Sequence, residues 1–213
     1  MLNNIRTSLR VITIVILPTF FTSIACAQSA IPSLGTGSCE IMIFSDYFCL
    51  PCERTATKAE PLIKELLATG KAKITFVDVQ FNPLAPMYSK YYLYAFNANA
   101  DVNNMLKVRR TLFEAAQEKH LQTEDALVHY LKLEHIAIKP MNEASVYPLI
   151  NLAIIKENIK TTPACIVRCD PLDEKKYVGA KEIINGLKEL KKKLEKRKRN
   201  SLYKIFLQLC SAD

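Results

Sequence analysis

Two cysteines separated by two residues, at the junction between an apolar strand and a helix, constrain the fold of this chain more than any other feature. The segment 40–45 (EIMIFS) is short, apolar and rich in β-formers, so it predicts a buried strand. Residues 50–69 carry apolar side chains at helical spacing, and Gly70 is a natural helix end. Cys49 and Cys52 therefore lie at the N-terminal end of the predicted helix.

That position favours redox chemistry for the pair. The unpaired N–H groups and partial positive charge of a helix N-terminus stabilise a thiolate, which is the reactive form of cysteine. We expect Cys49 to be the attacking nucleophile and Cys52 the resolving thiol, because both lie on one helical turn and can close a disulfide. A structural zinc half-site and a chance pair are the alternatives, but zinc usually takes four ligands and no second pair of this spacing occurs. We expect no cofactor and no metal.

The rest of the chain alternates strands with helices. Residues 73–81 predict a second strand, 86–160 have a helical pattern, two short strands are predicted at 165–168 and 176–179, and 180–198 predicts a final helix. The helices expected within the central block are 88–98, 102–119, 123–133 and 142–159. This order predicts an α/β protein with a central mixed sheet and helices on both of its faces.

The residues around the cysteine pair resemble those of DsbA-like thiol–disulfide oxidoreductases of the thioredoxin-fold superfamily. The similar segments are IFSDYFCLPC at 43–52, the helical block, NIKTTP at 158–163 and KYVG at 176–179, within a region of about 40–194. The resemblance implies a thioredoxin fold with an inserted all-helical subdomain at 86–160. It also implies an enzyme that exchanges disulfides with other proteins.

The same resemblance implies two further site residues. Pro163 corresponds to the cis proline beside the redox pair, and the backbone of Thr162 is expected to contact the chain of the substrate protein. The sequence departs from the family in three places: Ile43 replaces an interior acid, the dipeptide between the cysteines is Leu-Pro and lacks the histidine of strong oxidants, and Thr162 precedes the proline as in isomerases and reductases. The sequence therefore leaves the direction of electron transfer open.

The thioredoxin fold also predicts a pairing for two of the other cysteines. In this fold the strand before the redox pair runs antiparallel to the strand after the proline. If Ser45 lies near Ala164, then Cys39 lies near Cys169, and we expect a structural disulfide between these two cysteines. Cys165 and Cys169 are four residues apart in an extended segment, which is too far for a bond between them, so we expect Cys165 to be a small buried side chain.

The N-terminal residues 1–27 have the pattern of a secretory signal peptide. Two arginines precede an apolar run at 11–25, and the small residues at 25–27 fit a cleavage site. The run is shorter than a membrane-spanning helix requires. An uncleaved anchor and a lipid-modified Cys26 are the alternatives. We therefore expect a periplasmic or otherwise exported protein, in a compartment where disulfides persist.

Basic charge is concentrated near the C-terminus. The chain carries a net charge of +8, and residues 188–199 contain eight basic and two acidic side chains. The remainder is near neutral, so the charge does not indicate a nucleic-acid partner. An apolar stripe at helical spacing follows the basic stretch, and it could contact the domain, a second copy or an anionic membrane surface. The stripe consists of Leu202, Ile205, Phe206 and Leu209.

These patterns divide the chain into a signal peptide and four further segments. The signal peptide is 1–27. The other segments are the N-terminal part of the thioredoxin fold at 28–85, the helical insertion at 86–160, the C-terminal part of the fold at 161–194 and a basic, amphipathic tail at 195–213.

Two classes of function are compatible with this organisation. The first is an enzyme that exchanges disulfides with exported, cysteine-containing proteins and is itself recycled by a membrane or soluble redox partner. The second is a binding or assembly module of a secretion or envelope apparatus, without essential redox activity. The intact cysteine pair favours the enzyme.

Overall fold

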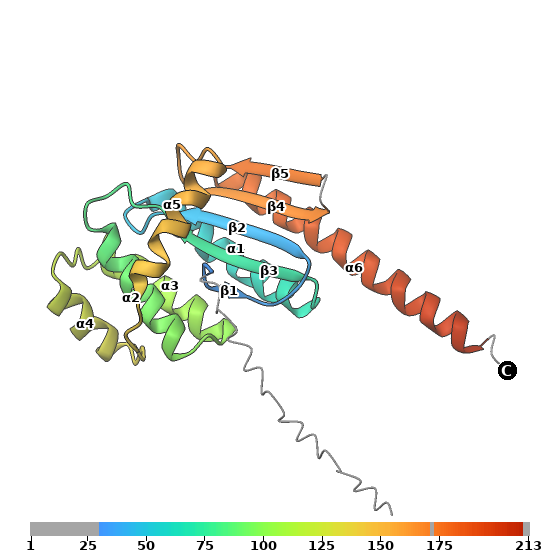
Figure 1. Ribbon diagram of the computed structural model, residues 1–213, viewed down its shortest axis with the longest axis horizontal. Helices are drawn as coiled ribbons and strands as arrows, with labels where there is room; N and C mark the ends of the chain where they lie inside the picture. The colour runs from blue at the N-terminus through green and yellow to red at the C-terminus, as the bar shows by residue number, and fades with distance from the viewer. Residues whose placement is uncertain (1–29, 171–172, 211–213) are drawn as a thin grey trace, which may run out of the picture.

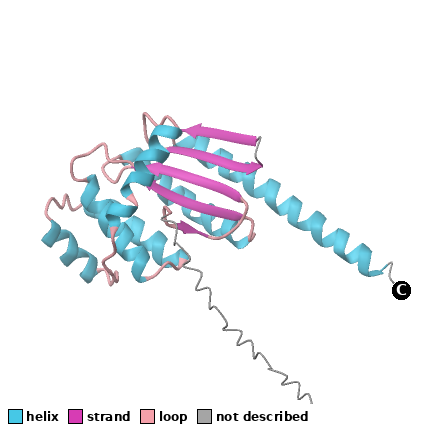
Figure 2. Cartoon of the chain, in the orientation of Figure 1, coloured by secondary structure: helices cyan, strands magenta, loops and turns pink. Residues whose placement is uncertain are grey.

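The computed structural model describes residues 30–170 and 173–210, and the side chains of 197–210 are outside the description. The expected signal peptide, Cys26 and the apolar stripe of the tail therefore lie outside the described residues or side chains. A five-stranded sheet in the order β1-β3-β2-β4-β5 forms the centre of the molecule (Figure 2). The strands are β1 (Ser33–Leu34), β2 (Cys39–Ser45), β3 (Ala72–Asp78), β4 (Ala164–Asp170) and β5 (Asp173–Val178).

The sheet is mixed, and helices cover it on both faces. β2 and β3 are parallel, whereas β2 with β4, β4 with β5, and β1 with β3 are antiparallel. Two helices, α1 (Leu50–Ala68) and α6 (Ala180–Cys210), pack side by side behind the sheet, and α5 (Tyr147–Lys156) crosses in front of it (Figure 1). The predicted α/β thioredoxin fold, with its mixed sheet between helices, is confirmed.

The remaining helices fall within the predicted insertion. They are α2 (Ala85–Ala98), α3 (Val102–Gln117), α4 (Glu124–Leu133) and the short 3₁₀ helix η1 (Glu143–Ser145). The single helix expected at 142–159 is instead η1 followed by α5. Pro148 lies in the first turn of α5, where the missing N–H of proline costs little, so the chain starts a new helix there. The helix expected to end at 198 continues as α6 to Cys210 and crosses the expected start of the tail.

β2 is the central strand, and its composition explains why. All of its side chains except that of Glu40 are buried, which suits a strand covered on both faces. Its register with β4 pairs Phe44 with Ala164, and Glu40 with Arg168. The expected register, with Ser45 beside Ala164, was therefore one residue out.

Two cysteines meet at the far end of these strands. Cys39 and Cys169 are joined in a disulfide, with their Cα atoms 3.9 Å apart. Cys39 is buried at the start of β2, and the bond closes a ring with a sequence separation of 130 residues. Cross-linking so long a segment removes much conformational freedom from the unfolded chain.

Cys165 is a buried thiol in the middle of the sheet. It lies opposite Ile43 in the β2–β4 register and is the one free thiol among the cysteines whose side chains the structure describes. Burial raises the pKa of its thiol to about 12. It therefore contributes to the core as a small apolar side chain.

Across the described parts of the chain, no helix is both long enough and apolar enough to span a bilayer.

Loss of the Cys39–Cys169 bond should destabilise the oxidised protein. We expect the double variant Cys39→Ala/Cys169→Ala to lose about 4 kcal/mol of unfolding free energy, because the cross-link no longer restricts the unfolded chain. Denaturant titration of the oxidised protein measures this. The control is Cys165→Ala, which removes a thiol from the same strand and opens no ring, with an expected loss of about 1 kcal/mol. Equal losses in the two proteins would contradict the structural role of the bond.

Cys165 should resist alkylation while the protein is folded. Its thiol is buried and stays protonated near neutral pH, because a raised pKa leaves almost no thiolate below that value. Mass mapping after iodoacetamide treatment should find it unmodified in the native protein and modified in denaturant. Rapid labelling of the native protein at neutral pH would show that this part of the sheet opens.

Candidate active site

Cys49 and Cys52 form a disulfide at the N-terminal end of α1. Cys49 is the N-cap residue, in an extended conformation (φ −101°, ψ 102°), and Pro51 occupies the first turn. The Cα atoms of the two cysteines are 5.2 Å apart. Cys49 is partly exposed, whereas Cys52 is 1% exposed. The two sulfur atoms therefore have unequal access to a partner molecule.

The loop before β4 lies directly against this disulfide. The Thr162–Pro163 peptide bond is cis, and Sγ of Cys49 lies 3.6 Å from the carbonyl oxygen of Thr162. Pro163 is buried, and its carbonyl oxygen accepts a hydrogen bond of 2.9 Å from the N–H of Gly179 at the end of β5. Four of the predicted site residues thus meet here: Cys49, Cys52, Thr162 and Pro163. The other two, Cys39 and Cys169, lie at the opposite end of the β2–β4 pair.

An open groove of about 300 Å³ passes over Cys49. Thr162 lies on one side of it, and Phe48, Phe81 and Pro83 supply apolar walls. Phe81 is 56% exposed and Leu50, next to Cys49, is 46% exposed. Large exposed apolar side chains beside a reactive group suit contact with another protein.

Asp46 fixes the shape of this groove. Its Oδ1 accepts a hydrogen bond from the N–H of Phe48, and its Oδ2 accepts from the N–H groups of Phe81 and Asn82, at 2.8, 3.0 and 3.1 Å. The carboxylate therefore joins the loop before Cys49 to the loop after β3. Asp46 is only 3% exposed. Nothing in its position three residues before Cys49 indicated this burial.

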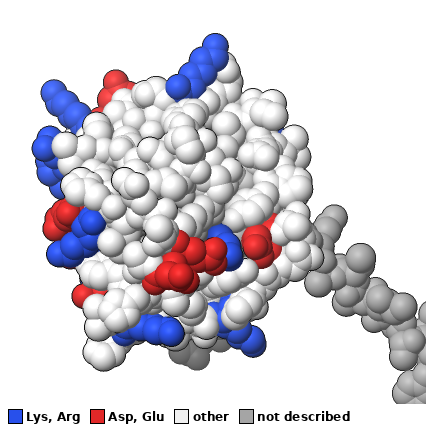
Figure 3. Space-filling view, turned by 90° about the vertical axis from the view of Figure 1, so that its left-hand side faces the viewer, with Lys and Arg blue, Asp and Glu red and all other residues white. Residues whose placement is uncertain are grey.

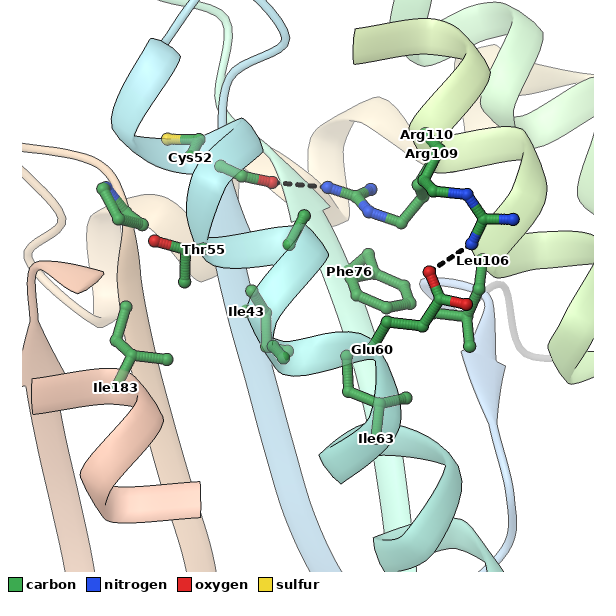
Figure 4. Close-up of a pocket in the computed structure, with 14 residues that line it drawn as sticks. Ile43, Cys52, Thr55, Glu60, Ile63, Phe76, Leu106, Arg109, Arg110 and Ile183 are labelled. Atoms are coloured by element: carbon green, nitrogen blue, oxygen red, sulfur yellow. Dashed lines mark hydrogen bonds and ion pairs between the residues drawn. The ribbon is translucent and has the colours of Figure 1, made fainter. Parts of the chain in front are cut away.

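A second, partly open space lies behind the disulfide, on the side of Cys52. It has room for about one water molecule, with a volume of about 20 Å³ available to the centre of a water-sized sphere. Its lining is mainly apolar and includes Cys52, Pro163, Ile43 and Phe76 (Figure 4). Arg109 from α3 points across this space toward the end of α1 that carries Cys52.

Arg109 belongs to a buried polar cluster that sequence reasoning missed. Its Nη1 donates to Oδ1 of Asp78 at 3.1 Å and to the hydroxyl of Tyr47 at 3.3 Å, and its Nη2 donates to Oγ of Ser45 at 2.6 Å. The Tyr47 hydroxyl donates in turn to Oδ2 of Asp78 at 3.2 Å. The guanidinium also stacks on the ring of Phe76, 4.2 Å from its centroid.

The surroundings keep Arg109 charged. Burial alone would lower the pKa of its guanidinium, but Tyr47 and the Asp78 carboxylate hold that pKa above its usual value. Burial raises the pKa of the Asp78 carboxyl, and Arg109 opposes this rise. The available sequence signal was an arginine in an otherwise apolar register of α3, between Met105 and Leu112, both of which are fully buried.

The face that carries the redox site has few charges. β2 and β3 end on the left-hand side of Figure 1, which faces the viewer in Figure 3. Charged side chains lie along the edges and lower part of this face, with a broad uncharged area between them (Figure 3). Over the residues described, no group of three or more His, Cys, Asp or Glu side chains is arranged to hold a metal.

Comparisons with known proteins agree with this geometry. A family model described as thioredoxin matches residues 36–186. No curated protein sequence matches the chain significantly. Among solved structures, α-DsbA1 of Wolbachia pipientis is similar with a TM-score of 0.58 and 16% identity, covering 80% of this chain and 93% of that one.

Two further structures have the same fold. Proteus mirabilis ScsC, in a linker-deletion variant, gives a TM-score of 0.58 and 18% identity over 78% of this chain and 74% of that one. A periplasmic thioredoxin-like protein of Salmonella enterica serovar Typhimurium gives 0.54 and 15% over 75% and 88%. The family match covers most of the sequence, and the structural matches cover most of each neighbour. This chain therefore belongs to the thioredoxin family and has the fold of its DsbA-like members.

Proposed function

We propose that this chain is a thiol–disulfide oxidoreductase that exchanges disulfides with cysteine-containing exported proteins through Cys49 and Cys52. The unequal exposure of the pair carries the proposal. Cys49 lies in an open groove at a helix N-terminus, and Cys52 is buried behind it. A partner protein must reach the attacking sulfur, whereas the resolving sulfur needs only to reach its neighbour.

The chemistry requires only the two cysteines and a substrate. In the oxidising direction, a substrate thiolate attacks Sγ of Cys49, the Cys49–Cys52 bond breaks, and Cys52 leaves as a thiolate that takes up a proton. A second substrate thiolate then attacks the substrate sulfur of the mixed disulfide and releases Cys49 as a thiolate. Two electrons pass from the substrate to the pair, and the reverse sequence reduces a substrate disulfide.

The groove supplies the contacts that hold a substrate. Thr162 lies beside Cys49 in the loop before β4 and lines the open groove, so we expect its backbone to pair with an extended substrate segment as an added strand would. Phe48 and Phe81 flank the same position and favour apolar residues near the substrate cysteine. The resulting preference is for unfolded or extended segments with a cysteine among apolar side chains.

The residues next to Cys49 favour an intermediate redox poise. Leu50 carries no charge or hydrogen-bond donor in its side chain, so it adds nothing to the stabilisation that the helix N-terminus gives the Cys49 thiolate. Recycling then requires a membrane or soluble redox partner. The signal-peptide pattern at 1–27, together with the similarity to a periplasmic thioredoxin-like protein, supports a periplasmic or otherwise exported location.

A binding or assembly module is the second candidate. α6 extends well beyond the edge of the sheet (Figure 1), and Leu152 and Ile155 of α5 are 60% and 74% exposed. These features favour contact with a partner or a membrane surface through a region other than the redox groove. Both roles can coexist in one protein, and they differ in whether Cys49 is required.

The two cysteines should behave differently when replaced singly. We expect Cys52→Ser to accumulate a mixed disulfide between Cys49 and a reduced, unfolded substrate after oxidation, because no second thiol can release it. Cys49→Ser should form little or none, since Cys52 is buried. Non-reducing electrophoresis followed by mass mapping measures the adduct, and Cys165→Ser is the matched control for loss of a thiol. A Cys49→Ser protein with full biological activity would instead support the binding module.

Replacement of Leu50 by histidine should make the protein more oxidising. A partly protonated imidazole beside Cys49 stabilises its thiolate and thus the reduced pair, so we expect the exchange constant with glutathione to change about tenfold, or about 30 mV. Equilibration with glutathione buffers measures the shift. Leu50→Asn is the control for polarity without charge. A shift of equal size in both variants would show that charge beside Cys49 is not the cause.

A further inference from the structure

The buried position of Cys52 leaves one step of the proposed reaction without a supporting group. To release a mixed disulfide, Cys52 must become a thiolate, yet its side chain is 1% exposed. Burial disfavours the charged form of a thiol unless a nearby group compensates for the lost water. The space behind Cys52 has Ile43 on its wall, so the interior position that could carry an acid is apolar.

The buried charge that reaches this space is a cation. Arg109 lines it together with Cys52, and Figure 4 shows the guanidinium directed from α3 toward the start of α1. The two ends of the guanidinium differ in their partners. Nη1 is bound to the Asp78 carboxylate, whereas Nη2 donates to the hydroxyl of Ser45, which lines the same space as Cys52. The positive end of the ion pair thus faces the resolving cysteine.

Ser45 connects Arg109 to the cavity. Its oxygen accepts a short hydrogen bond of 2.6 Å from the guanidinium. A hydroxyl that accepts a hydrogen bond still has its own hydrogen to donate. The cavity has room for about one water, so the hydroxyl can act on Cys52 directly or through that water. Charge on the guanidinium polarises this hydroxyl and strengthens it as a donor.

We propose that Arg109, acting through Ser45, is a positioning residue that stabilises the Cys52 thiolate during resolution of the mixed disulfide. The inference rests on the proposed function and concerns one step. The Cys52 thiol gives its proton to solvent, and its thiolate attacks Sγ of Cys49. The Cys49–Cys52 bond forms, the bond from Cys49 to the substrate breaks, and the substrate sulfur leaves as a thiolate that takes up a proton. Over the formation and the resolution of the mixed disulfide together, the cysteine pair loses two electrons and the substrate disulfide gains them.

The arrangement predicts opposite effects for the two members of the ion pair. A cation lowers the pKa of a nearby thiol and an anion raises it. Removal of the Arg109 charge should therefore raise the pKa of Cys52, and removal of the Asp78 charge should lower it. A purely structural role gives a different result, because loss of either member destabilises a buried pair in the same direction.

The test measures ionisation of Cys52 in the full chain with Cys49→Ser, from thiolate absorbance against pH. Subtraction of the Cys49→Ser/Cys52→Ser signal removes the contribution of the other thiols. We expect Arg109→Met and Ser45→Ala to raise the midpoint by about one pH unit, and Asp78→Asn to lower it. Arg109→Lys should retain most of the effect. Arg110→Gln is the matched control, because Arg110 lines the same space but is exposed and paired with Glu60. The Cys52 midpoint should not move in this variant.

The outcomes separate this inference from the proposed function. Midpoints that move in the same direction for Arg109→Met and Asp78→Asn, or that do not move, overturn the inference. If Arg109→Met does not fold, Ser45→Ala decides, since it leaves the Arg109–Asp78 pair intact. An unchanged midpoint in Ser45→Ala then overturns the proposal that Arg109 acts on Cys52 through Ser45. Failure of the Cys52→Ser protein to trap a substrate overturns the proposed function, whatever the pH titrations show.

Discussion

The placement of both disulfides in the structure depends on the antiparallel pairing of β2 with β4. With Phe44 opposite Ala164, the end of β2 lies beside the Thr162–Pro163 loop, and this places the cysteine pair against that loop. The same ladder brings the start of β2 beside the end of β4, where Cys39 and Cys169 are bonded. A slip of one residue would turn every side chain of β2 to the other face and would separate both pairs of contacts.

The helical insertion supplies the cation of the buried polar cluster beside the site. Arg109 of α3 binds the end of β2 at Ser45, the following loop at Tyr47 and the end of β3 at Asp78. A buried ion pair is a weak source of stability, because both groups lose their hydration. Besides the electrostatic role proposed for Arg109, these contacts connect the insertion to the ends of β2 and β3, next to the redox loop. This explains why a charged side chain is retained within an apolar face of α3.

The sequence was most informative where the pattern was local. The strand before Cys49 and the helix after it could be predicted because apolar spacing reflects neighbouring residues, whereas the position of Pro163 beside the cysteine pair was implied by the resemblance to DsbA-like proteins. Strand β1, with two residues, was too short to give a pattern. The partners of Arg109 and the bonds from Phe81 and Asn82 to Asp46 were missed, because each of these contacts joins residues that are far apart in the chain. Such contacts depend on the fold, and composition alone does not reveal them.

The long final helix determines how the molecule can be oriented. α6 has 31 residues and therefore spans roughly 45 Å. Its C-terminal end lies on the opposite side of the molecule from the ends of β2 and β3 (Figure 1). An attachment made at that end leaves the groove over Cys49 facing away from the point of attachment. The helix would then act as a rigid spacer, and the accessible sulfur would face outward toward incoming chains.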